Sequence, residues 1–502
     1  MPLPKYIKTY DTLLASVAGY IAVYLYTKYS GVGISPDSIM YASTAHNIAT
    51  HGSLLTFNGG PLVFFPVFYP FFLSVILFIT RIPTFNAAPV INGLLFAGVI
   101  FLSGYLLSRF KNYSGIYKWL ILIGIVLSPG LLEIYSYLWS ETLFIFMVML
   151  YMLAHWHYMQ KHTTGRLLLL TLIIAIGCIT RYAGVTMILS GGLLLLFDPE
   201  LPVRKKIIHI LIFGFGSFSL LLANLIKNRL STGLSTGTRE PAITPFSQNM
   251  YYFGKVMCDW TGLPQTAYPY SIAIGSLVLI CLTSLLLWRL FKIKVNTAES
   301  IVLMFAVVYG FFIPVLATFS RFEPLNSRLL SPLYIAALIG ITSWLPGILD
   351  GKSTKAKAFI YVPFIALMLF FEYSVALTDY QRYDDEFDYG VPGYSDDDWN
   401  GKPFITFLKT HPNIYKPGVP RYSDADEAVY FFSGGTAKLL PHRYFTNTVS
   451  QFFNVKHFYL IWFDTLNNTE LIGIKDIEEH GKLKKLYSFP EGTIYEYYAN
   501  VN

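Results

Sequence analysis

The stretch Ile34-Ser-Pro-Asp-Ser-Ile-Met-Tyr41 follows the first long apolar run of the chain and carries a single carboxylate, Asp37. Its pattern predicts a short helix that begins near Pro36 and continues to about Thr50. Almost all of the sequence around it is hydrophobic. An ionised group beside so much apolar surface is costly, so Asp37 indicates a functional role.

The composition indicates a membrane protein. Of the 502 residues, 54% are hydrophobic and only 13% are charged, whereas a soluble domain carries about 25% charged residues. Aromatic residues make up 17%, and many stand at the ends of apolar runs, where interfacial Trp and Tyr belong. A soluble protein could not bury this much apolar surface, so the sequence predicts a polytopic α-helical membrane protein.

The charge distribution argues against a nucleic-acid partner. The formal net charge is +7, but the basic residues fall in small clusters between apolar runs, a pattern that orients membrane segments. No basic stripe with interleaved aromatics and no nucleic-acid motif is present. The three cysteines, Cys178, Cys258 and Cys281, show neither metal-ligand spacing nor a disulfide framework.

The first crossing is predicted at about Asp11–Tyr29, followed by an outer loop over about residues 30–86. Within that loop, Phe71–Thr80 is apolar but covers only about 15 Å as a helix, half the hydrocarbon thickness. Pro66 and Pro70 interrupt any extension of it. We therefore expect a juxtamembrane helix that does not cross.

This choice fixes the rest of the topology. Ten further crossings are expected at about 87–108, 117–135, 141–159, 167–181, 183–197, 207–227, 268–288, 299–319, 329–346 and 358–377. The inner loops then hold most of the basic clusters, as the positive-inside rule requires. These are Lys5 and Lys8; Arg109, Lys111 and Lys118; Lys161 and Arg166; Arg204, Lys205 and Lys206; Arg289, Lys292 and Lys294; and Lys352, Lys355 and Lys357. The prediction is about eleven transmembrane helices, with the N-terminus inside and the C-terminus outside.

The remaining tail has no spanning segment. Residues 1–377 are expected to form the membrane domain, and residues 378–502 a small soluble α/β domain on the outer face. Helices are predicted at Pro403–Thr410, at Asp424–Phe432, capped by Asp424 and stopped by Gly434-Gly435, and at Ile474–His480. Strands are predicted at Val419–Ser423 and Phe458–Phe463, with a hairpin over Leu486–Tyr498.

On this topology, polar residues from separate segments meet at the outer rim: Asp37, Glu141, Arg181, Arg321 and Arg328. A guanidinium grips a phosphate through paired hydrogen bonds. A carboxylate beside that phosphate can take the proton from an attacking hydroxyl. The set therefore suggests group transfer from a lipid-linked phosphate carrier.

Structural interpretations of the same residues remain open. The arginines Arg181 and Arg321 would also suit interfacial anchors. Glu141 would suit the positive end of a helix dipole, and Asp37 would suit a helix cap. For a divalent cation the sequence offers only Asp37 and Glu141 as ligands, fewer than such a site usually has. No cofactor is assigned, and a cation held by these two carboxylates stays open as a weaker alternative.

The order of several motifs resembles the GT-C membrane glycosyltransferases, particularly the branch of protein O-mannosyltransferases and lipid A aminoarabinose transferases. The motifs are Asp37 with Tyr41 four positions on, Ala-x-x-Ile-Ala, Gly52 and a Pro-rich apolar segment, then Ser140-Glu141, Thr180-Arg181 and Arg328-x-x-x-Pro332. The resemblance covers about residues 1–345. This chain has Asp37-Ser38 where many members have Asp-Glu, and Phe64-Phe65-Pro66 where the aminoarabinose branch has Lys before its prolines.

The resemblance implies an inverting hexosyl- or pentosyltransferase that uses a polyprenyl-phosphate sugar donor at the outer face. It implies that Asp37 is the general base and that Glu141, which matches the acidic residue of the second loop, is a second catalytic residue. Arg181 and Arg328 match basic positions near the carrier phosphate, and Tyr41 and Arg321 are further substrate-binding candidates. The acceptor would be a lipid, glycan or protein, and the short loops suit a bacterial inner membrane.

Two other classes of function fit the predicted topology. A transporter or flippase of lipid-linked saccharides would also have many crossings and outer-rim arginines. Such proteins often show internal repeats and ionisable residues near the membrane midplane, and the charges here lie at helix ends. A polymerase or ligase with a lipid-pyrophosphate donor would suit a long outer loop such as Asn228–Gln265, which carries Arg229, Arg239 and Lys255.

Overall fold

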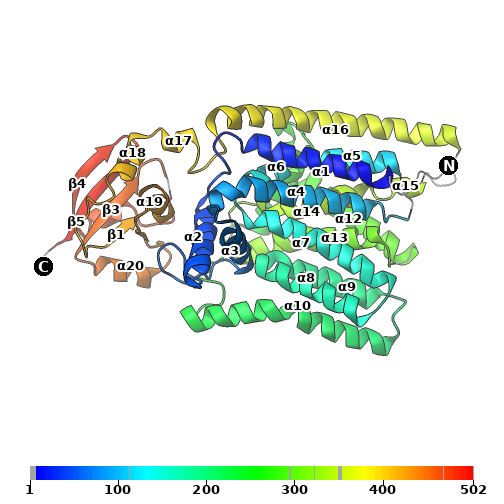
Figure 1. Ribbon diagram of the computed structural model, residues 1–502, viewed down its shortest axis with the longest axis horizontal. Helices are drawn as coiled ribbons and strands as arrows, with labels where there is room; N and C mark the ends of the chain where they lie inside the picture. Colours follow the sequence, from blue (N-terminus) through cyan, green and yellow to red (C-terminus); the bar gives the residue numbers. More distant parts are fainter. Residues whose placement is uncertain are drawn as a thin grey trace. The chain divides into compact units, whose positions relative to one another are not determined.

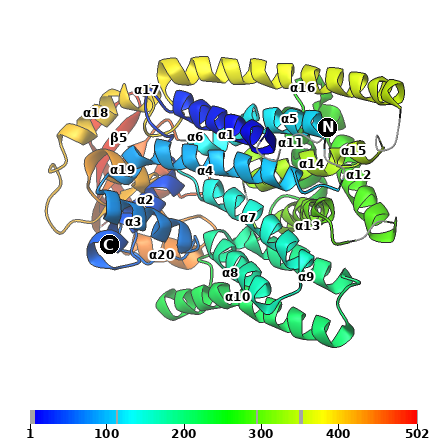
Figure 2. The same ribbon diagram turned by 45° about the vertical axis from the view of Figure 1, so that its right-hand side comes forward.

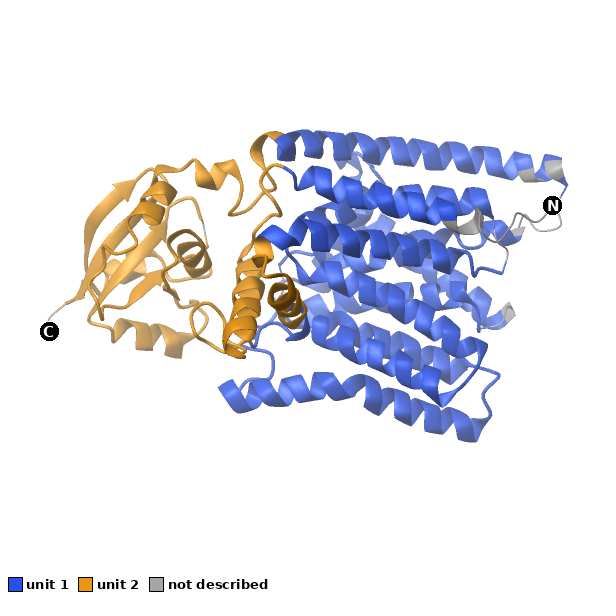
Figure 3. Cartoon of the chain, viewed as in Figure 1, with its two compact units in different colours: residues 1–28, 63–69, 86–387 blue, residues 29–62, 70–85, 388–502 orange. Residues whose placement is uncertain are grey.

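The structure, a computed structural model, describes residues 7–111, 114–292, 295–321, 323–348, 353–466 and 468–500 (Figure 1). Lys5, Lys294 and Lys352, which the sequence places in inner loops, lie outside these ranges. The chain forms two compact units, shown in Figure 3. Unit 1 comprises Met1–Lys28, Val63–Tyr69 and Asn86–Phe387, and unit 2 comprises Tyr29–Leu62, Pro70–Phe85 and Asp388–Asn502. Most of the predicted first outer loop therefore belongs to the same unit as the C-terminal residues.

Unit 1 is a bundle of helices formed by the apolar runs of the sequence. The α-helices are α1 (Ile7–Tyr26), α4 (Thr84–Leu107), α5 (Gly115–Val126), α6 (Pro129–Ser136), α7 (Ser140–Gln160), α8 (Thr164–Thr180), α9 (Val185–Phe197), α10 (Val203–Thr232), α11 (Phe246–Trp260), α12 (Ser271–Lys292), α13 (Ala298–Phe319), α14 (Ser327–Thr342), α15 (Leu345–Ile348) and α16 (Thr354–Tyr389). In both Figure 1 and Figure 2, α16 runs beside α1. The Tyr26 hydroxyl ties the two helices together by donating to the Asp379 carbonyl at 2.7 Å.

Among the described residues, seven helices are long and apolar enough to cross a membrane. The pair α5 and α6 makes an eighth if it is one span bent by 48°. The bend falls where Pro129 opens α6 and the Ser128 side chain accepts from the backbone N–H of Leu131. A helix lies at each predicted position, but α8 and α9, with 17 and 13 residues, are shorter than these spans. The predicted number of eleven is therefore not confirmed.

Several loops predicted to share the inner face do lie together in unit 1. Glu299 accepts from the backbone N–H of Lys111 at 3.3 Å and lies 3.8 Å from Arg289. Asp198 binds both His162, at 2.7 Å, and Asn296, at 3.1 Å. The four loops near residues 111, 162, 198 and 296, which the basic clusters assign to one face, therefore lie at the same end of the bundle.

Lys118 was wrongly assigned to an inner loop. It lies in the first turns of α5, is 1% exposed, and its ammonium lies 2.7 Å from the Asp11 carboxylate of α1. An ion pair at this depth is stable only because each charge compensates the other. Lys118 therefore gives no information on the topology, because its role is to pair α5 with α1.

The predicted loop Asn228–Gln265 contains a helix that the sequence interpretation missed. α10 continues to Thr232, and α11 follows at Phe246–Trp260. One face of α11 is buried, and Gly254 packs so tightly on α12 that a Cβ there would stand 1.7 Å from the Ser271 carbonyl oxygen. Glycine permits this backbone approach because it has no side chain.

Unit 2 contains a five-stranded sheet of order β2-β1-β3-β5-β4. Its strands are β1 (Arg421–Ser423), β2 (Lys438–Leu439), β3 (His457–Phe463), β4 (Gly481–Phe489) and β5 (Gly492–Ala499). Strand β1 is parallel to β2 and β3, whereas β5 is antiparallel to β3 and β4. The helices are α2 (Pro36–His51), most of α3 (Phe68–Thr80), α17 (Asp397–Asn400), α18 (Pro403–Thr410), α19 (Asp426–Ser433), α20 (Thr446–Phe453) and α21 (Ile474–Glu478).

One apolar core joins the first-loop helix to the sheet of unit 2. Ile39 of α2 is buried in the same cluster as Phe404, Val429 and Ile461. Helix α3 has 13 residues, about 20 Å of helix, which supports the interpretation that it does not cross. The helix Pro403–Thr410 is found at its predicted bounds.

The predicted cap at Asp424 is wrong. Helix α19 begins at Asp426 with Ala425 as its N-cap residue, and Asp424 accepts from the backbone N–H of Phe463 at 3.0 Å. Its carboxylate therefore fastens the end of β1 to the end of β3. The predicted stop is confirmed, because Gly434 ends α19 in the left-handed conformation with φ 66°.

Candidate functional site

A single carboxylate holds two guanidinium groups at one end of unit 1. Glu141 lies in the first turn of α7 and its side chain is 1% exposed. Its Oε2 lies 2.7 Å from Nη1 of Arg181, and its Oε1 lies 2.6 Å from Nε of Arg328. We call these three residues the arginine clamp. Two positive groups share one negative group, so the clamp carries one net positive charge.

Arg181 reaches Glu141 because the turn between α8 and α9 is very tight. Helix α8 ends at Thr180, Arg181 is extended, and a 3₁₀ turn, η1 (Tyr182–Gly184), leads into α9. A Cβ at Gly184 would stand 2.6 Å from the Cα of Cys178. Glycine at position 184 therefore allows the chain to fold back here. The Arg181 side chain is also held by Ser140, because its Nη1 donates to the Ser140 hydroxyl at 2.8 Å.

Arg328 lies in the first turn of α14, where a helix dipole disfavours a cation. Two contacts offset that cost. One is the Glu141 ion pair, and the other is Trp139, whose ring lies 4.2 Å from Cζ of Arg328. Trp139 is itself stacked on Tyr137, with ring centroids 4.1 Å apart. The Arg328 guanidinium is thus held between the Glu141 carboxylate and the face of the Trp139 ring.

The clamp is suited to an anion. The N-terminal ends of α7 and α14 meet there, and each contributes the partial positive charge of a helix N-terminus. The side chains of Arg181 and Arg328 remain 20% and 17% exposed, whereas Glu141 is fully enclosed. A phosphate can therefore approach both guanidinium groups from their exposed side.

Arg321 lies in a separate ion pair. Its guanidinium binds Glu240, its backbone N–H donates to the Glu240 carbonyl at 3.2 Å, and Ser320 pairs with Pro241. These contacts fasten the segment before α11 to the end of α13. The structure does not bring Arg321 into the arginine clamp.

Asp37 and Tyr41 lie one helical turn apart on α2, in unit 2. The N-cap residue of α2 is Ser35, which forms a capping box with Ser38, and Gly52 ends the helix with φ 65°. Capping therefore does not account for Asp37, which is half-buried in the first turn. Tyr41 and Thr44 follow Asp37 on the same helical face, and both are buried.

The side chain of Glu141 is a poor candidate for a metal ligand, because both of its oxygens are engaged by guanidinium nitrogens. Within the described part of the chain, no group of three or more His, Cys, Asp or Glu side chains is arranged to hold a metal ion.

Sequence reasoning missed Trp139, Tyr137 and Glu240. The aromatic residues directly before Ser140-Glu141 were the available signal for the first two.

The bundle and the sheet together have counterparts of known structure. ArnT from Cupriavidus metallidurans superposes with a TM-score of 0.57 at 11% identity, covering 97% of each chain, and its structure bound to undecaprenyl phosphate gives 0.56. The Archaeoglobus fulgidus oligosaccharyltransferase tethered with an acceptor peptide gives 0.54 at 12% identity, covering 99% of this chain and 74% of that one. The fold is that of the GT-C membrane glycosyltransferases.

A third counterpart is the mycobacterial arabinofuranosyltransferase AftD, with a TM-score of 0.53 at 15% identity, covering 98% of this chain and 40% of that one. By sequence, no family model and no curated protein matches the chain. The resemblance derived from the motif order is therefore confirmed at the level of the fold.

Proposed function

We propose that this protein is an inverting membrane glycosyltransferase that moves a sugar from a polyprenyl-phosphate donor to an acceptor hydroxyl. The arginine clamp carries the proposal, because it offers a preorganised cationic site at one end of a bundle with the GT-C fold. Two structures with this fold support the donor class. ArnT is described bound to undecaprenyl phosphate, and the archaeal oligosaccharyltransferase in complex with a dolichol-phosphate.

In this proposal Arg181 and Arg328 bind the donor phosphate. The bond between the anomeric carbon and the phosphate oxygen breaks, and the guanidinium groups stabilise the negative charge that grows on the leaving phosphate. Glu141 is a positioning residue, because both of its oxygens hold the arginines in place. Arg321 has no role in this step, since its guanidinium is engaged with Glu240.

Asp37 is proposed as the general base. It removes the proton of the acceptor hydroxyl as the oxygen attacks the anomeric carbon from the face opposite the phosphate, which inverts that centre. Tyr41, one turn further along α2, is proposed to contact substrate. The proposal assigns no step to a divalent cation.

We further propose a bacterial inner-membrane location with the N-terminus in the cytoplasm. The arginine clamp and the domain formed by residues of about 378–502 are then on the extracytoplasmic side. The distribution of basic residues among the loops supports this orientation.

The proposal is tested with membranes that contain the protein and polyprenyl-phosphate sugars radiolabelled in the sugar, one hexose and one pentose. We expect release of free polyprenyl phosphate and transfer of label to an endogenous acceptor for one of the two donors. Matched membranes with the Arg181→Ala variant provide the control. Label that crosses the membrane while still attached to its carrier would instead identify a flippase and overturn the proposal.

A further inference from the structure

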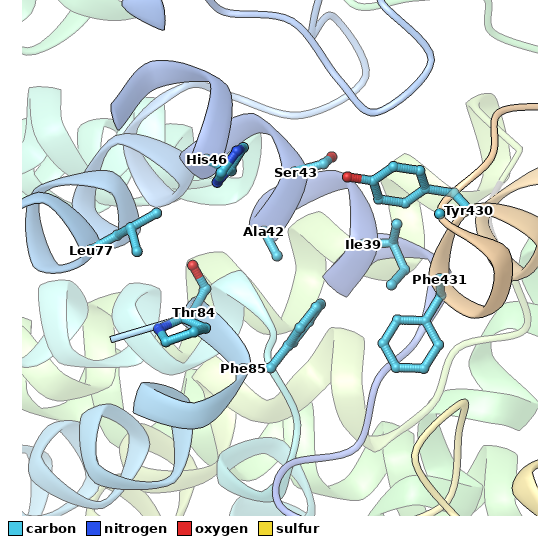
Figure 4. A pocket seen from close by; sticks show the side chains of 11 residues that line it. Ile39, Ala42, Ser43, His46, Leu77, Thr84, Phe85, Tyr430 and Phe431 are labelled. Atoms are coloured by element: carbon cyan, nitrogen blue, oxygen red, sulfur yellow. The ribbon is translucent and has the colours of Figure 1, made fainter. Parts of the chain in front are cut away.

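Unit 2 encloses a pocket of about 620 Å³, drawn in Figure 4. Helix α2 forms one wall, the start of α4 and the end of α3 form another, and α19 closes a third side. The lining residues are Ile39, Ala42, Ser43, His46, Leu77, Pro83, Thr84, Phe85, Tyr430, Phe431 and Gly434. This volume falls in the range of pockets that hold small ligands, about 300–1,000 Å³.

The pocket and Asp37 lie on opposite faces of α2. Ile39, Ala42, Ser43 and His46 follow the spacing of a single helical face, and all four line the pocket. Asp37 precedes Ile39 by two positions, a rotation of about 200° at 3.6 residues per turn. The pocket is therefore a second binding surface, separate from the face that carries the proposed base.

The pocket walls combine aromatic rings with hydroxyl groups. Phe85 and Phe431 pack edge to face with centroids 5.8 Å apart, and the Tyr430 ring is held 5.0 Å from that of Phe57. Ser43 and Thr84 are buried, and Figure 4 shows the hydroxyls of Ser43 and Tyr430 on the same side of the pocket. The Ser43 hydroxyl donates to the Met40 carbonyl at 3.3 Å, and its oxygen can still accept a hydrogen bond from a ligand. A hydrocarbon chain would make no use of the polar groups on this wall, whereas a ligand with hydroxyls would.

The pocket also lacks the groups that an anion needs. None of its eleven lining residues is Asp, Glu, Lys or Arg. A phosphate or carboxylate placed there would lose its hydration and meet no permanently charged cation, because His46 is the one basic side chain among the eleven lining residues. The ligand that fits is neutral and has both an apolar face and several hydroxyls, which describes a sugar ring.

We infer that this pocket binds a neutral saccharide unit of the acceptor, with the sugar ring against Phe85 and Phe431 and its hydroxyls bonded to Ser43, Thr84 and Tyr430. The inference rests on the proposed function, because it takes the acceptor to be a glycan or glycolipid. It deepens that function by naming the acceptor class and by separating acceptor recognition from the donor phosphate site.

The test measures binding without turnover. Saturation-transfer NMR is recorded on the full chain in lipid nanodiscs with methyl α-glucoside, methyl α-mannoside, methyl α-galactoside and methyl N-acetyl-glucosaminide, each beside its 6-phosphate. We expect transfer to the ring C–H protons of at least one neutral glycoside and none to its phosphate. Phe431→Ala and Ser43→Leu should each reduce that transfer at least about fivefold, which corresponds to about 1 kcal/mol.

Two control variants make the result decisive. Asp398→Asn changes an exposed acidic residue of unit 2 that does not line the pocket, and it should retain full glycoside binding. Tyr444→Ala removes an exposed aromatic side chain elsewhere in unit 2 and should also bind normally. Equal signals in wild type and Phe431→Ala, or no signal with any neutral glycoside, would overturn the inference. If the wild-type protein binds a neutral glycoside in this way but turns over no polyprenyl-phosphate sugar, the proposed function is contradicted and the saccharide pocket is not.

Discussion

The Nε atom of Arg328 lies 2.6 Å from Oε1 of Glu141, although 187 positions separate the two residues in the sequence. The same carboxylate holds Arg181 through its other oxygen. If the buried Glu141 carboxylate were removed, both Arg181 and Arg328 would lose the negative charge that compensates them. Glu141 is therefore the residue on which the geometry of the proposed phosphate site depends.

We expect Glu141→Gln to destabilise the protein by about 3–5 kcal/mol, the range for breaking a buried ion pair. The variant should also bind the donor more weakly, because the carboxamide has one acceptor oxygen and can hold at most one of the two guanidinium groups in position. Thermal unfolding of the purified protein and the donor KM measure the two effects. Glu240→Gln breaks the separate Arg321 pair and should leave the donor KM unchanged; an equal rise in both variants would contradict the positioning role.

Arg181→Lys and Arg328→Lys should each raise the donor KM about tenfold or more. An ammonium keeps the charge but loses the planar, paired hydrogen bonds that a guanidinium makes to phosphate. Trp139→Leu, which removes the ring beside Arg328, should raise the same KM about two- to fivefold. Steady-state kinetics over a range of donor concentrations measure these values. Arg321→Lys serves as the matched control. A larger rise in donor KM for Arg321→Lys than for the other two variants would indicate that the phosphate binds at Arg321.

Asp37→Asn should lower kcat about 10²–10⁴-fold and change the donor KM little, as expected when a general base is lost. Asp37→Glu should retain part of the activity, since the carboxylate is kept but displaced. Asp398→Asn, an exposed acidic residue of unit 2, should behave as wild type. Normal turnover by Asp37→Asn in the radiolabel assay would remove Asp37 from the mechanism.

A dependence of stability on pH is expected from Asp426. Burial raises the pKa of Asp426 to about 9, and the neighbouring Glu427 carboxylate adds to the rise, whereas an unfolded Asp titrates near about 3.9. The folded protein thus keeps a proton that the unfolded chain releases, so stability falls as the pH rises from about 4 to about 9.

Asp426→Asn removes this titration. We expect the melting temperatures of wild type and variant to differ least near pH 4 and to diverge in favour of the variant up to pH 9. Thermal unfolding followed by tryptophan fluorescence at pH 5, 7 and 9 tests this, with Asp398→Asn as the control. Parallel curves for wild type and Asp426→Asn would show that Asp426 is ionised in the folded state.

The close approach of α11 to α12 gives a structural prediction. Gly254→Ala would place a methyl group against the Ser271 carbonyl, so we expect little monodisperse protein after solubilisation. Gly214 lies inside α10 with no neighbouring atom within 4 Å of the position that a methyl group would take, so Gly214→Ala should be tolerated or slightly stabilising. Equal yields of the two variants would show that the helix missed from the sequence does not pack as described.

The sequence predicted the positions of most helices of unit 1 because most of them are apolar runs with polar ends, although the predicted number of crossings is not confirmed. It missed α11 because that helix is amphipathic and stands within a polar stretch, where only one face is buried. Lys118 was misjudged for a related reason. Its partner Asp11 is distant in the sequence, so nothing local distinguished a buried ion pair from a basic loop.

The proximity of three candidate site residues was predicted, but not their contacts. The motif order singled out Glu141, Arg181 and Arg328, and packing brings these three together. Motif order could not distinguish Arg321, which binds Glu240, from the arginines of the clamp. Nor could it show that guanidinium groups engage both oxygens of Glu141. This contact changes the proposed role of Glu141 from a catalytic residue to a positioning residue.

The Asp11–Lys118 pair has a consequence for biogenesis. The two residues are 107 positions apart, and at about 5–20 residues per second the ribosome needs roughly 5–20 s to synthesise the chain between them. During that interval α1 has left the ribosome while its counter-ion does not yet exist. The nascent helix must therefore keep Asp11 hydrated at the membrane edge, and it reaches its final depth only when α5 arrives.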